Sequence, residues 1–330
     1  MTGTVITAPI RFGVLGAARI ADLAIVRPAR VTGHRLVAVA ARDRRRAEDF
    51  ARQYGVERVL GTYADILADT DVEAVYNPLA NALHGPWNLA AIQAGKHVLS
   101  EKPFASNADE ARVVRDAAAA AQVTVMEGFH YFYHPVTRRL HELLDSGELG
   151  ELRAVEIDMF MPAPDDGDPR WSYELAGGVL MDLGCYSLHA HRALAPWAGG
   201  PPRVAAARAG ERAGHPGVDE WLDADLEFPG GATGRARCSM SADRPTPTSL
   251  RRSPPTCATV PRCPPMRTTR SPTCSSSTTA IAPPASPRAQ PASRSSTKQP
   301  VDPSRRRPRT RTLEEQADDV RCRAGLPVRR

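Results

Sequence analysis

The 330-residue chain has few aromatic side chains, few cysteines and no long apolar run. Phe, Tyr and Trp make up 5% of the residues, and none of them occurs after Phe228. No segment holds 18 apolar residues without a charge, so the sequence predicts no membrane-spanning helix. The first nine residues lack the basic stretch and apolar run of a signal peptide. We therefore expect a cytoplasmic protein without a membrane partner.

The six cysteines show no metal-binding or disulfide pattern. Only Cys185 and Cys238 precede residue 250, and no pair has the CxxC spacing. Two histidine pairs, His130 with His134 and His189 with His191, lack suitably spaced carboxylate or thiolate partners. The sequence predicts neither a metal site nor a disulfide framework.

The positive net charge of +6 comes entirely from the C-terminal quarter. Residues 1–250 hold 26 Lys and Arg against 32 Asp and Glu, whereas residues 251–330 hold 17 against 5. The same tail carries 14 of the 30 prolines, abundant Ser and Thr, and no aromatic residue. Such a segment buries too little apolar surface to offset its ordering entropy, so we expect residues 251–330 to be irregular or largely disordered.

The first 128 residues alternate between short aliphatic runs and helical stretches, as in a parallel sheet with crossover helices. The predicted strands are Ile10–Leu15, Leu36–Ala41, Glu57–Leu60, Val72–Tyr76, His97–Ser100 and Val123–Glu127. The predicted helices include Arg44–Tyr54 and Ala108–Ala121, the second with Asn107 as its N-cap. This pattern predicts an α/β Rossmann domain, a doubly wound parallel sheet, over residues 1–128.

Residues 129–250 have the pattern of an α+β domain with an open, mostly antiparallel sheet. Helices are predicted at Pro135–Leu144 and Gly178–Leu194, and strands at Leu152–Met161, Val204–Arg208, Leu222–Phe228 and Thr233–Met240. We expect this domain to hold the substrate, and we expect it to be incomplete, because nothing in 251–315 continues its pattern.

A glycine-containing turn after the first strand predicts dinucleotide binding. Small residues there let the backbone approach a pyrophosphate at a helix N-terminus. Ala18 and Ala21 stand where the second and third glycines of GxGxxG are usual, so an ordinary strand-to-helix turn is the alternative. The candidate cofactor residues of this segment are Gly13, Gly16, Ala17, Ala18, Arg19 and Ile20.

Arg42, after the second predicted strand, favours NADP over NAD. Its guanidinium can bind a 2′-phosphate with two hydrogen bonds and stack on adenine. Asp43 could instead bind the ribose of NAD, and a solvated basic helix start is the structural alternative.

Three further motifs carry a family resemblance: Glu101-Lys102-Pro103, the turn at 147–153, and the Gly-Gly-rich segment at 177–187. From about Ile10 to Met240, the chain resembles the glucose–fructose oxidoreductase / inositol dehydrogenase family, closest to its sugar and dihydrodiol dehydrogenases. The resemblance implies an NADP-dependent oxidoreductase acting on a CH–OH or keto carbon of a sugar or related small polyol. It also implies cofactor contacts from Leu79, Asn81, His84, Glu101, Lys102 and Trp171.

The same resemblance implies that Lys102, Tyr186 and Asp182 are catalytic. Oxidising a carbinol needs a group that takes the hydroxyl proton while hydride leaves for the nicotinamide. Asp182 and Tyr186 are four residues apart and would share one face of a helix. The structural alternatives are a surface lysine, a core tyrosine and a capping aspartate.

The tail leaves two hypotheses open. A frameshift would produce its Pro/Arg/Ser/Thr mixture, and resequencing the coding DNA would test this. An altered C-terminus would put in doubt the homo-oligomer that the family forms through its substrate-domain sheet. Alternatively, the tail is a basic arm that binds nucleic acid or an acidic partner beside a cofactor-sensing Rossmann body. Its single lysine and lack of aromatics argue against nucleic acid.

Overall fold

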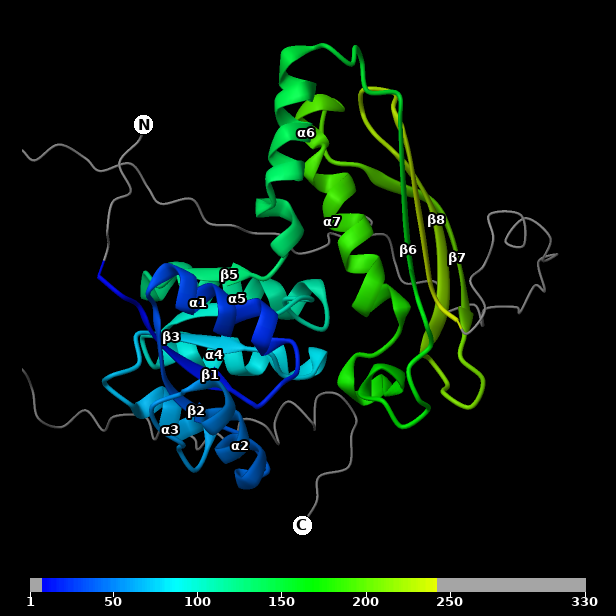
Figure 1. The fold of residues 1–330 in the computed structure, drawn as a ribbon. Coiled ribbons are helices and arrows are strands. Elements are labelled where there is room, and N and C mark those ends of the chain that lie inside the picture. The colour runs from blue at the N-terminus through cyan, green and yellow to red at the C-terminus, as the bar shows by residue number, and fades with distance from the viewer. Residues whose placement is uncertain (1–7, 242–330) are drawn as a thin grey trace, which may run out of the picture. The chain divides into compact units, whose positions relative to one another are not determined.

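A parallel sheet forms the first half of the fold in the computed structural model, which describes residues 8–241 (Figure 1). Five strands lie in the order β2-β1-β3-β4-β5, and every pairing is parallel. The strands are β1 Arg11–Leu15, β2 Arg35–Ala40, β3 Ala74–Asn77, β4 His97–Ser100 and β5 Val125–Glu127. The predicted Rossmann architecture is confirmed.

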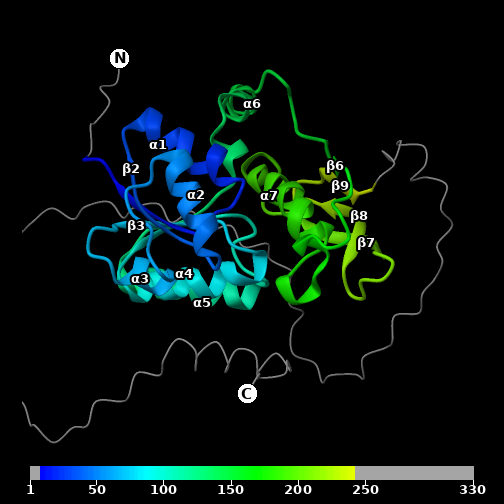
Figure 2. The same cartoon turned by 60° about the horizontal axis from the view of Figure 1, so that its bottom comes forward.

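Helices cover both faces of this sheet, as Figure 2 shows. One buried cluster joins the sheet to α3, α4 and α5, and a second joins it to α1 and α2. A π-helical turn over Asp22–Val26 precedes α1. The helices are α1 Arg27–Thr32, α2 Arg44–Tyr54, α3 Tyr63–Ala68, α4 His84–Gln93 and α5 Ala108–Ala121. Asn107 caps α5 as predicted, because its side chain accepts from Glu110 N–H.

The prediction of a strand at Glu57–Leu60 was wrong. Only Val59 forms a ladder pair, a single bridge to Val39. The segment is too short to extend further, because Thr62 already caps α3 through a reciprocal pair of hydrogen bonds with Asp65.

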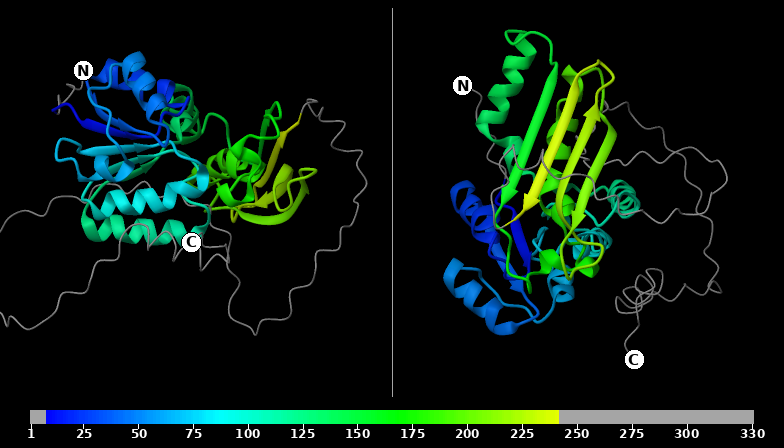
Figure 3. Two further views of the ribbon diagram at one scale, coloured as in Figure 1. Left: turned by 90° about the horizontal axis from the view of Figure 1, so that it is seen from below. Right: turned by 90° about the vertical axis from the view of Figure 1, so that its right-hand side faces the viewer.

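The second sheet has four strands in the order β6-β9-β8-β7 and is shown face-on in Figure 3. Two of its three pairings are antiparallel, and β6 pairs with β9 in parallel. The predicted mostly antiparallel sheet is therefore confirmed. Its strands are β6 Ala154–Met161, β7 Arg203–Glu211, β8 Asp219–Glu227 and β9 Thr233–Met240.

The helices of the second half are α6 Pro135–Ser146 and α7 Cys185–Ala193. A π-helical turn over Leu180–Gly184 leads directly into α7. Trp171, Val179 and Leu183 pack with Leu222 and Met240 in a buried cluster between these segments and the sheet. This packing holds the start of the predicted active-site helix against the second sheet. The tail expected over 251–330 lies outside the described residues.

Candidate functional site

The turn after β1 lies where the strand order reverses, at the carboxyl edge of the sheet. The chain passes from β1 to β2 on one side and to β3 on the other, and ligands of doubly wound folds bind at this point. Gly16 has φ +99°, and its N–H donates to Ala40 O at 2.7 Å. A Cβ there would lie 3.1 Å from Leu79 Cδ2, so both the backbone conformation and the close approach of Leu79 favour glycine.

The N–H groups of Ala17, Ala18, Arg19 and Ile20 have no acceptor within residues 8–241. They immediately precede the helical segment that starts at Ala21, which is fully buried. A run of free N–H groups at a helix start suits a pyrophosphate. The residues present therefore fit a dinucleotide, with Ala18 and Ala21 in the place of glycines.

Gly13 does not belong to this loop. It lies inside β1, where a Cβ would stand 2.4 Å from Ile66 Cγ2 of α3. Its missing side chain serves helix-to-sheet packing, and its role in cofactor binding stays a prediction.

The adenosine end of the predicted cofactor site is basic and exposed. Arg42 is exposed and forms no ion pair within the described part of the chain, whereas Arg46 donates to Ala17 O at 3.1 Å. The Asp43 carboxylate caps α2 by accepting from Arg45 N–H at 2.9 Å. The cap therefore uses one oxygen of the Asp43 carboxylate, whereas the Arg42 side chain is exposed.

His84 is an interior residue. It is 1% exposed, and its two ring nitrogens lie 2.6 Å from Pro103 O and 2.8 Å from Leu79 O. Burial lowers its pKa, which the two carbonyl groups oppose. Both ring nitrogens contact backbone carbonyl groups, so the side chain holds the backbone of Leu79 and Pro103, and the cofactor contact of His84 stays a prediction.

Trp171 is also an interior residue, and its cofactor contact stays a prediction. Its side chain is 2% exposed and belongs to the core of the second half. Its indole N–H donates to Pro164 O at 3.1 Å, and the Arg212 guanidinium lies 4.7 Å from its ring centroid. Asn81 makes a structural contact as well, because its amide donates to Ala176 O at 2.9 Å.

The structure brings Lys102, Asp182 and Tyr186 together. Lys102 Nζ lies 2.7 Å from Asp182 Oδ1 and 2.9 Å from Asp182 O. It also lies 5.1 Å from the ring centroid of Tyr186. The side chains of Lys102 and Asp182 are 15% and 12% exposed, so the ion pair is largely removed from water.

Arg170 completes this ion-pair network. Its Nε lies 2.8 Å from Asp182 Oδ2, and its Nη1 lies 3.2 Å from the Asp168 carboxylate. Burial acts to raise the pKa of Asp182, but Lys102 and Arg170 outweigh burial and lower it. Burial acts to lower the pKa of Lys102, but Asp182 outweighs burial and raises it. At neutral pH the lysine is a cation and the aspartate is an anion.

The Tyr186 hydroxyl has no hydrogen-bond partner within residues 8–241. Burial raises the pKa of Tyr186, and Lys102 opposes this change, so the phenol stays protonated at neutral pH. The buried Glu101 lies beside these groups and accepts from Tyr76 Oη at 2.7 Å.

The aromatic run after β5 packs on α7. Phe129 stacks on His189 with ring centroids 4.0 Å apart, and Tyr131 Oη lies 2.5 Å from His189 Nδ1. Burial lowers the pKa of His189 to about 4, so the ring is neutral at pH 7. The described residues contain no cluster of three His, Cys, Asp or Glu suited to a metal ion.

Sequence reasoning missed a buried polar network that orders the ends of β3 and β4. Asn77 donates to His84 O at 3.2 Å and to Asn88 Oδ1 at 2.8 Å, and Asn88 donates to Ser100 Oγ at 2.9 Å. It also missed Glu127 at the end of β5. The sequence did contain a signal for Asn77, Ser100 and Glu127: they are polar and lie at or directly after the ends of predicted strands, and the carboxyl ends of parallel strands meet at one edge of the sheet.

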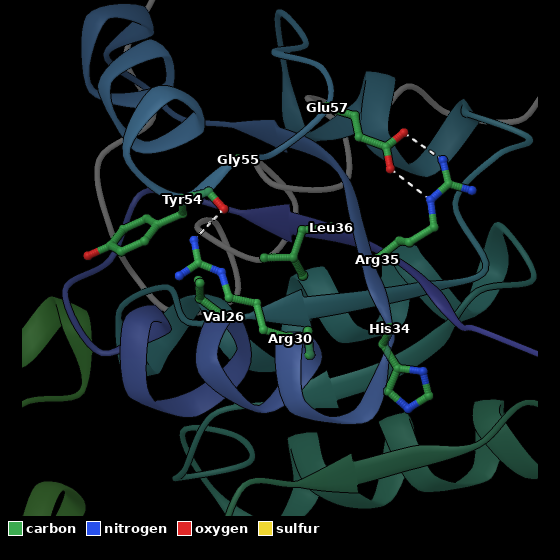
Figure 4. A pocket seen from close by; sticks show the side chains of 9 residues that line it. Val26, Arg30, His34, Arg35, Leu36, Tyr54, Gly55 and Glu57 are labelled. Carbon is green, nitrogen blue, oxygen red and sulfur yellow. Dashed lines mark hydrogen bonds and ion pairs between the residues drawn. The ribbon is translucent and has the colours of Figure 1, made fainter. Parts of the chain in front are cut away.

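A pocket of about 200 Å³ lies at the start of β2, between α1 and α2, away from the carboxyl edge of the sheet (Figure 4). Its cations are already partnered: Arg35 pairs with Glu57 at 2.7 Å, and Arg30 donates to Tyr54 O at 2.9 Å. Because Arg35 begins β2 and Gly16 follows the end of β1, this pocket is separate from the predicted cofactor site.

No helix among the described residues is long and apolar enough to cross a membrane. The fold and the lysine-centred site define the class: an oxidoreductase built on a dinucleotide-binding fold. Residues 10–129 match the oxidoreductase family with an NAD-binding Rossmann fold, and residues 137–252 match the GFO/IDH/MocA C-terminal domain. The chain belongs to this GFO/IDH/MocA oxidoreductase family.

Relatives of this chain include two named dehydrogenases. D-xylose 1-dehydrogenase (NADP(+)) 2 from Haloferax volcanii is 40% identical over 230 residues, 69% of each chain. Trans-1,2-dihydrobenzene-1,2-diol dehydrogenase from Mus musculus is 32% identical over 243 residues, 72% of this chain and 70% of the relative.

A solved structure with a similar fold is that of the 3-ketoreductase KijD10 from Actinomadura kijaniata, in complex with NADP and TDP-benzene. It has a TM-score of 0.65 and 32% identity over 70% of each chain. Matched structures of the same enzyme include variants in which a lysine or a tyrosine is replaced.

Proposed function

We propose that this chain transfers a hydride between NADP(H) and a carbon bearing a hydroxyl or keto oxygen on a sugar or related small polyol. The observation that carries the proposal is the position of Lys102, held by Asp182 beside the unpartnered phenol of Tyr186. The relatives support the substrate class, since one is a xylose dehydrogenase and another a 3-ketoreductase.

The side chains of the site supply proton transfer and charge stabilisation. Nicotinamide, when bound, supplies or accepts the hydride. Lys102 Nζ contacts Asp182 twice, which leaves one of its three protons for a substrate oxygen. The Tyr186 hydroxyl is a second donor. In reduction, one of these groups protonates the developing alkoxide. Oxidation is the reverse of this step, so a group takes the hydroxyl proton only after it has released its own proton to solvent.

The preference for NADP rests on Arg42. Its guanidinium is free for a 2′-phosphate, while the neighbouring Asp43 is engaged as a helix cap. Titrating the purified protein with NADPH and NADH, followed by nicotinamide fluorescence, tests this preference. Arg42→Ala should weaken NADPH binding at least about tenfold, roughly 1.4 kcal/mol, and should change NADH binding little.

Arg45→Ala is the matched control, since Arg45 is an exposed arginine in the first turn of α2, shortly after Arg42. An equal loss of NADPH affinity in both variants would assign the effect to general charge and contradict the role of Arg42.

Substrate screening tests the chemistry itself. Aldoses, keto sugars and cyclic trans-diols would be assayed with the cofactor that binds. Lys102→Ala should lower kcat by about a hundredfold and leave NADPH affinity within about threefold. A protein that binds NADPH and turns over none of these compounds would contradict the proposed substrate class.

A further inference from the structure

Glu127 lies next to the segment that carries Lys102, although it belongs to a different strand. It ends β5, and its register partner in the parallel pair is Ser100, which ends β4. From Ser100 the chain continues through Glu101 directly into Lys102. The sheet register therefore places the Glu127 carboxyl group at the base of the catalytic segment.

The two oxygens of this carboxyl group have different surroundings. Oε1 accepts from Phe104 N–H at 2.8 Å, two residues beyond Lys102. Oε2 is buried and has no hydrogen-bond partner among the described residues. A buried carboxylate with an unpaired oxygen is costly, so this environment favours the neutral carboxylic acid.

The charged and titratable groups around Glu127 come from two segments. Lys102 and Glu101 follow β4, and Cys185 begins α7. Burial raises the pKa of Glu127 to about 8, while the Phe104 N–H and Lys102 oppose this change and Glu101 adds to it. Near neutral pH, Lys102 therefore has an ionised partner in Asp182 and a neutral neighbour in Glu127.

We propose that Glu127 is a positioning residue for Lys102: one oxygen fixes the backbone at Phe104, and the proton on the other leaves Asp182 as the carboxylate that holds the lysine. This inference rests on the proposed function, because it assigns a consequence to the placement of Lys102. When Glu127 loses its proton, a second carboxylate competes for Nζ and draws it from the reacting oxygen. Turnover then falls as the pH rises through the titration of Glu127.

Glu127→Gln separates the two roles, because the amide oxygen can still accept from Phe104 N–H but the side chain cannot ionise. The alkaline limb of the kcat profile should move upward by at least about one pH unit, with KM changed less than about twofold. Glu127→Leu removes the acceptor as well and should lower kcat at least about tenfold, because the lysine is displaced.

Glu110→Gln is the matched control. Its carboxylate accepts from Ser106 N–H at 2.6 Å, so it makes the same kind of backbone contact in a neighbouring turn. This variant should keep the parent pH profile. An unchanged alkaline limb in Glu127→Gln would overturn the proposal.

Two measurements need no substrate and separate this inference from the proposed function. Infrared difference spectra of the unliganded protein should show a protonated carboxyl band that disappears as Glu127 ionises and is absent in Glu127→Gln. The ε-carbon resonance of isotope-labelled Lys102, assigned with Lys102→Ala, should shift over the same pH range in the parent and not in Glu127→Gln. Loss of either signature overturns the role of Glu127, whereas both signatures without any turnover contradict only the proposed activity.

Discussion

Asp182 divides its two carboxylate oxygens between two cations, Lys102 and Arg170. Removing one partner of a buried ion pair leaves an uncompensated charge, which typically costs about 3–5 kcal/mol. Burial by itself acts to lower the pKa of Lys102, and the Asp182 carboxylate is the main group that raises it. The aspartate therefore holds the lysine in position and favours its charged form.

Asp182→Asn should lower kcat by about a hundredfold at neutral pH and leave NADPH affinity nearly unchanged, because Lys102 loses the carboxylate that holds it and favours its charged form. Asp168→Asn is the control, since Asp168 contacts Arg170 at 3.2 Å without touching Lys102. Steady-state kinetics and fluorescence titration measure the two effects. Equal losses in both variants would assign the effect to Arg170.

For single residues, the sequence predicts the position of those that belong to a motif of neighbouring residues in the chain. Gly16 and Lys102 sit in short motifs, and both lie where the motifs predict. The interior positions of His84 and Trp171 were not predicted, because burial depends on residues distant in sequence. Glu127 was missed because its importance follows from the register between two strands.

Among the elements, β1 contains a glycine that is part of the dinucleotide-binding motif but that helix-to-sheet packing also requires. Gly13 lies against Ile66 of α3, while the turn that suits a pyrophosphate begins at Gly16. The strands of the sheet were predictable, because buried parallel strands are continuous aliphatic runs. The segment at Glu57–Leu60 has only two aliphatic residues, at its last two positions, and the helix cap at Thr62 follows its single bridge.

Gly13→Ala should lower the free energy of unfolding by about 1–3 kcal/mol through overpacking against Ile66. The folded fraction should keep the parent NADPH affinity. Gly167→Ala is the control, because nothing lies within 4 Å of a Cβ at that position. Denaturant titrations measure the difference, and a large loss of NADPH affinity in folded Gly13→Ala would return this glycine to the cofactor site.

For the molecule as a whole, Glu127 links stability to pH. Its pKa in the folded protein is raised to about 8 from an ordinary value of 4.5. A carboxyl group with a raised pKa in the folded state stabilises the fold fully below its ordinary pKa, and this contribution is lost as the pH rises through the folded value.

The free energy of unfolding should therefore decline between about pH 4.5 and 8, and the Glu127 contribution to that decline should vanish in Glu127→Gln. Chemical denaturation at a series of pH values measures both slopes. Identical slopes in the parent and the variant would show that Glu127 ionises normally in the folded protein.

The parallel pairing of β6 with β9 has a consequence for the order of assembly. β6 is the first strand of the second sheet in sequence, and β9 follows β7 and β8. Pairing Ala154 with Thr233 therefore closes a loop that contains the whole intervening chain. Closing so long a loop is slow compared with forming local contacts. Asp182 and Tyr186 lie inside that loop, whereas the turn at Gly16 is built from the first strands. During refolding, the ability to hold a dinucleotide should therefore return before the ability to turn over substrate.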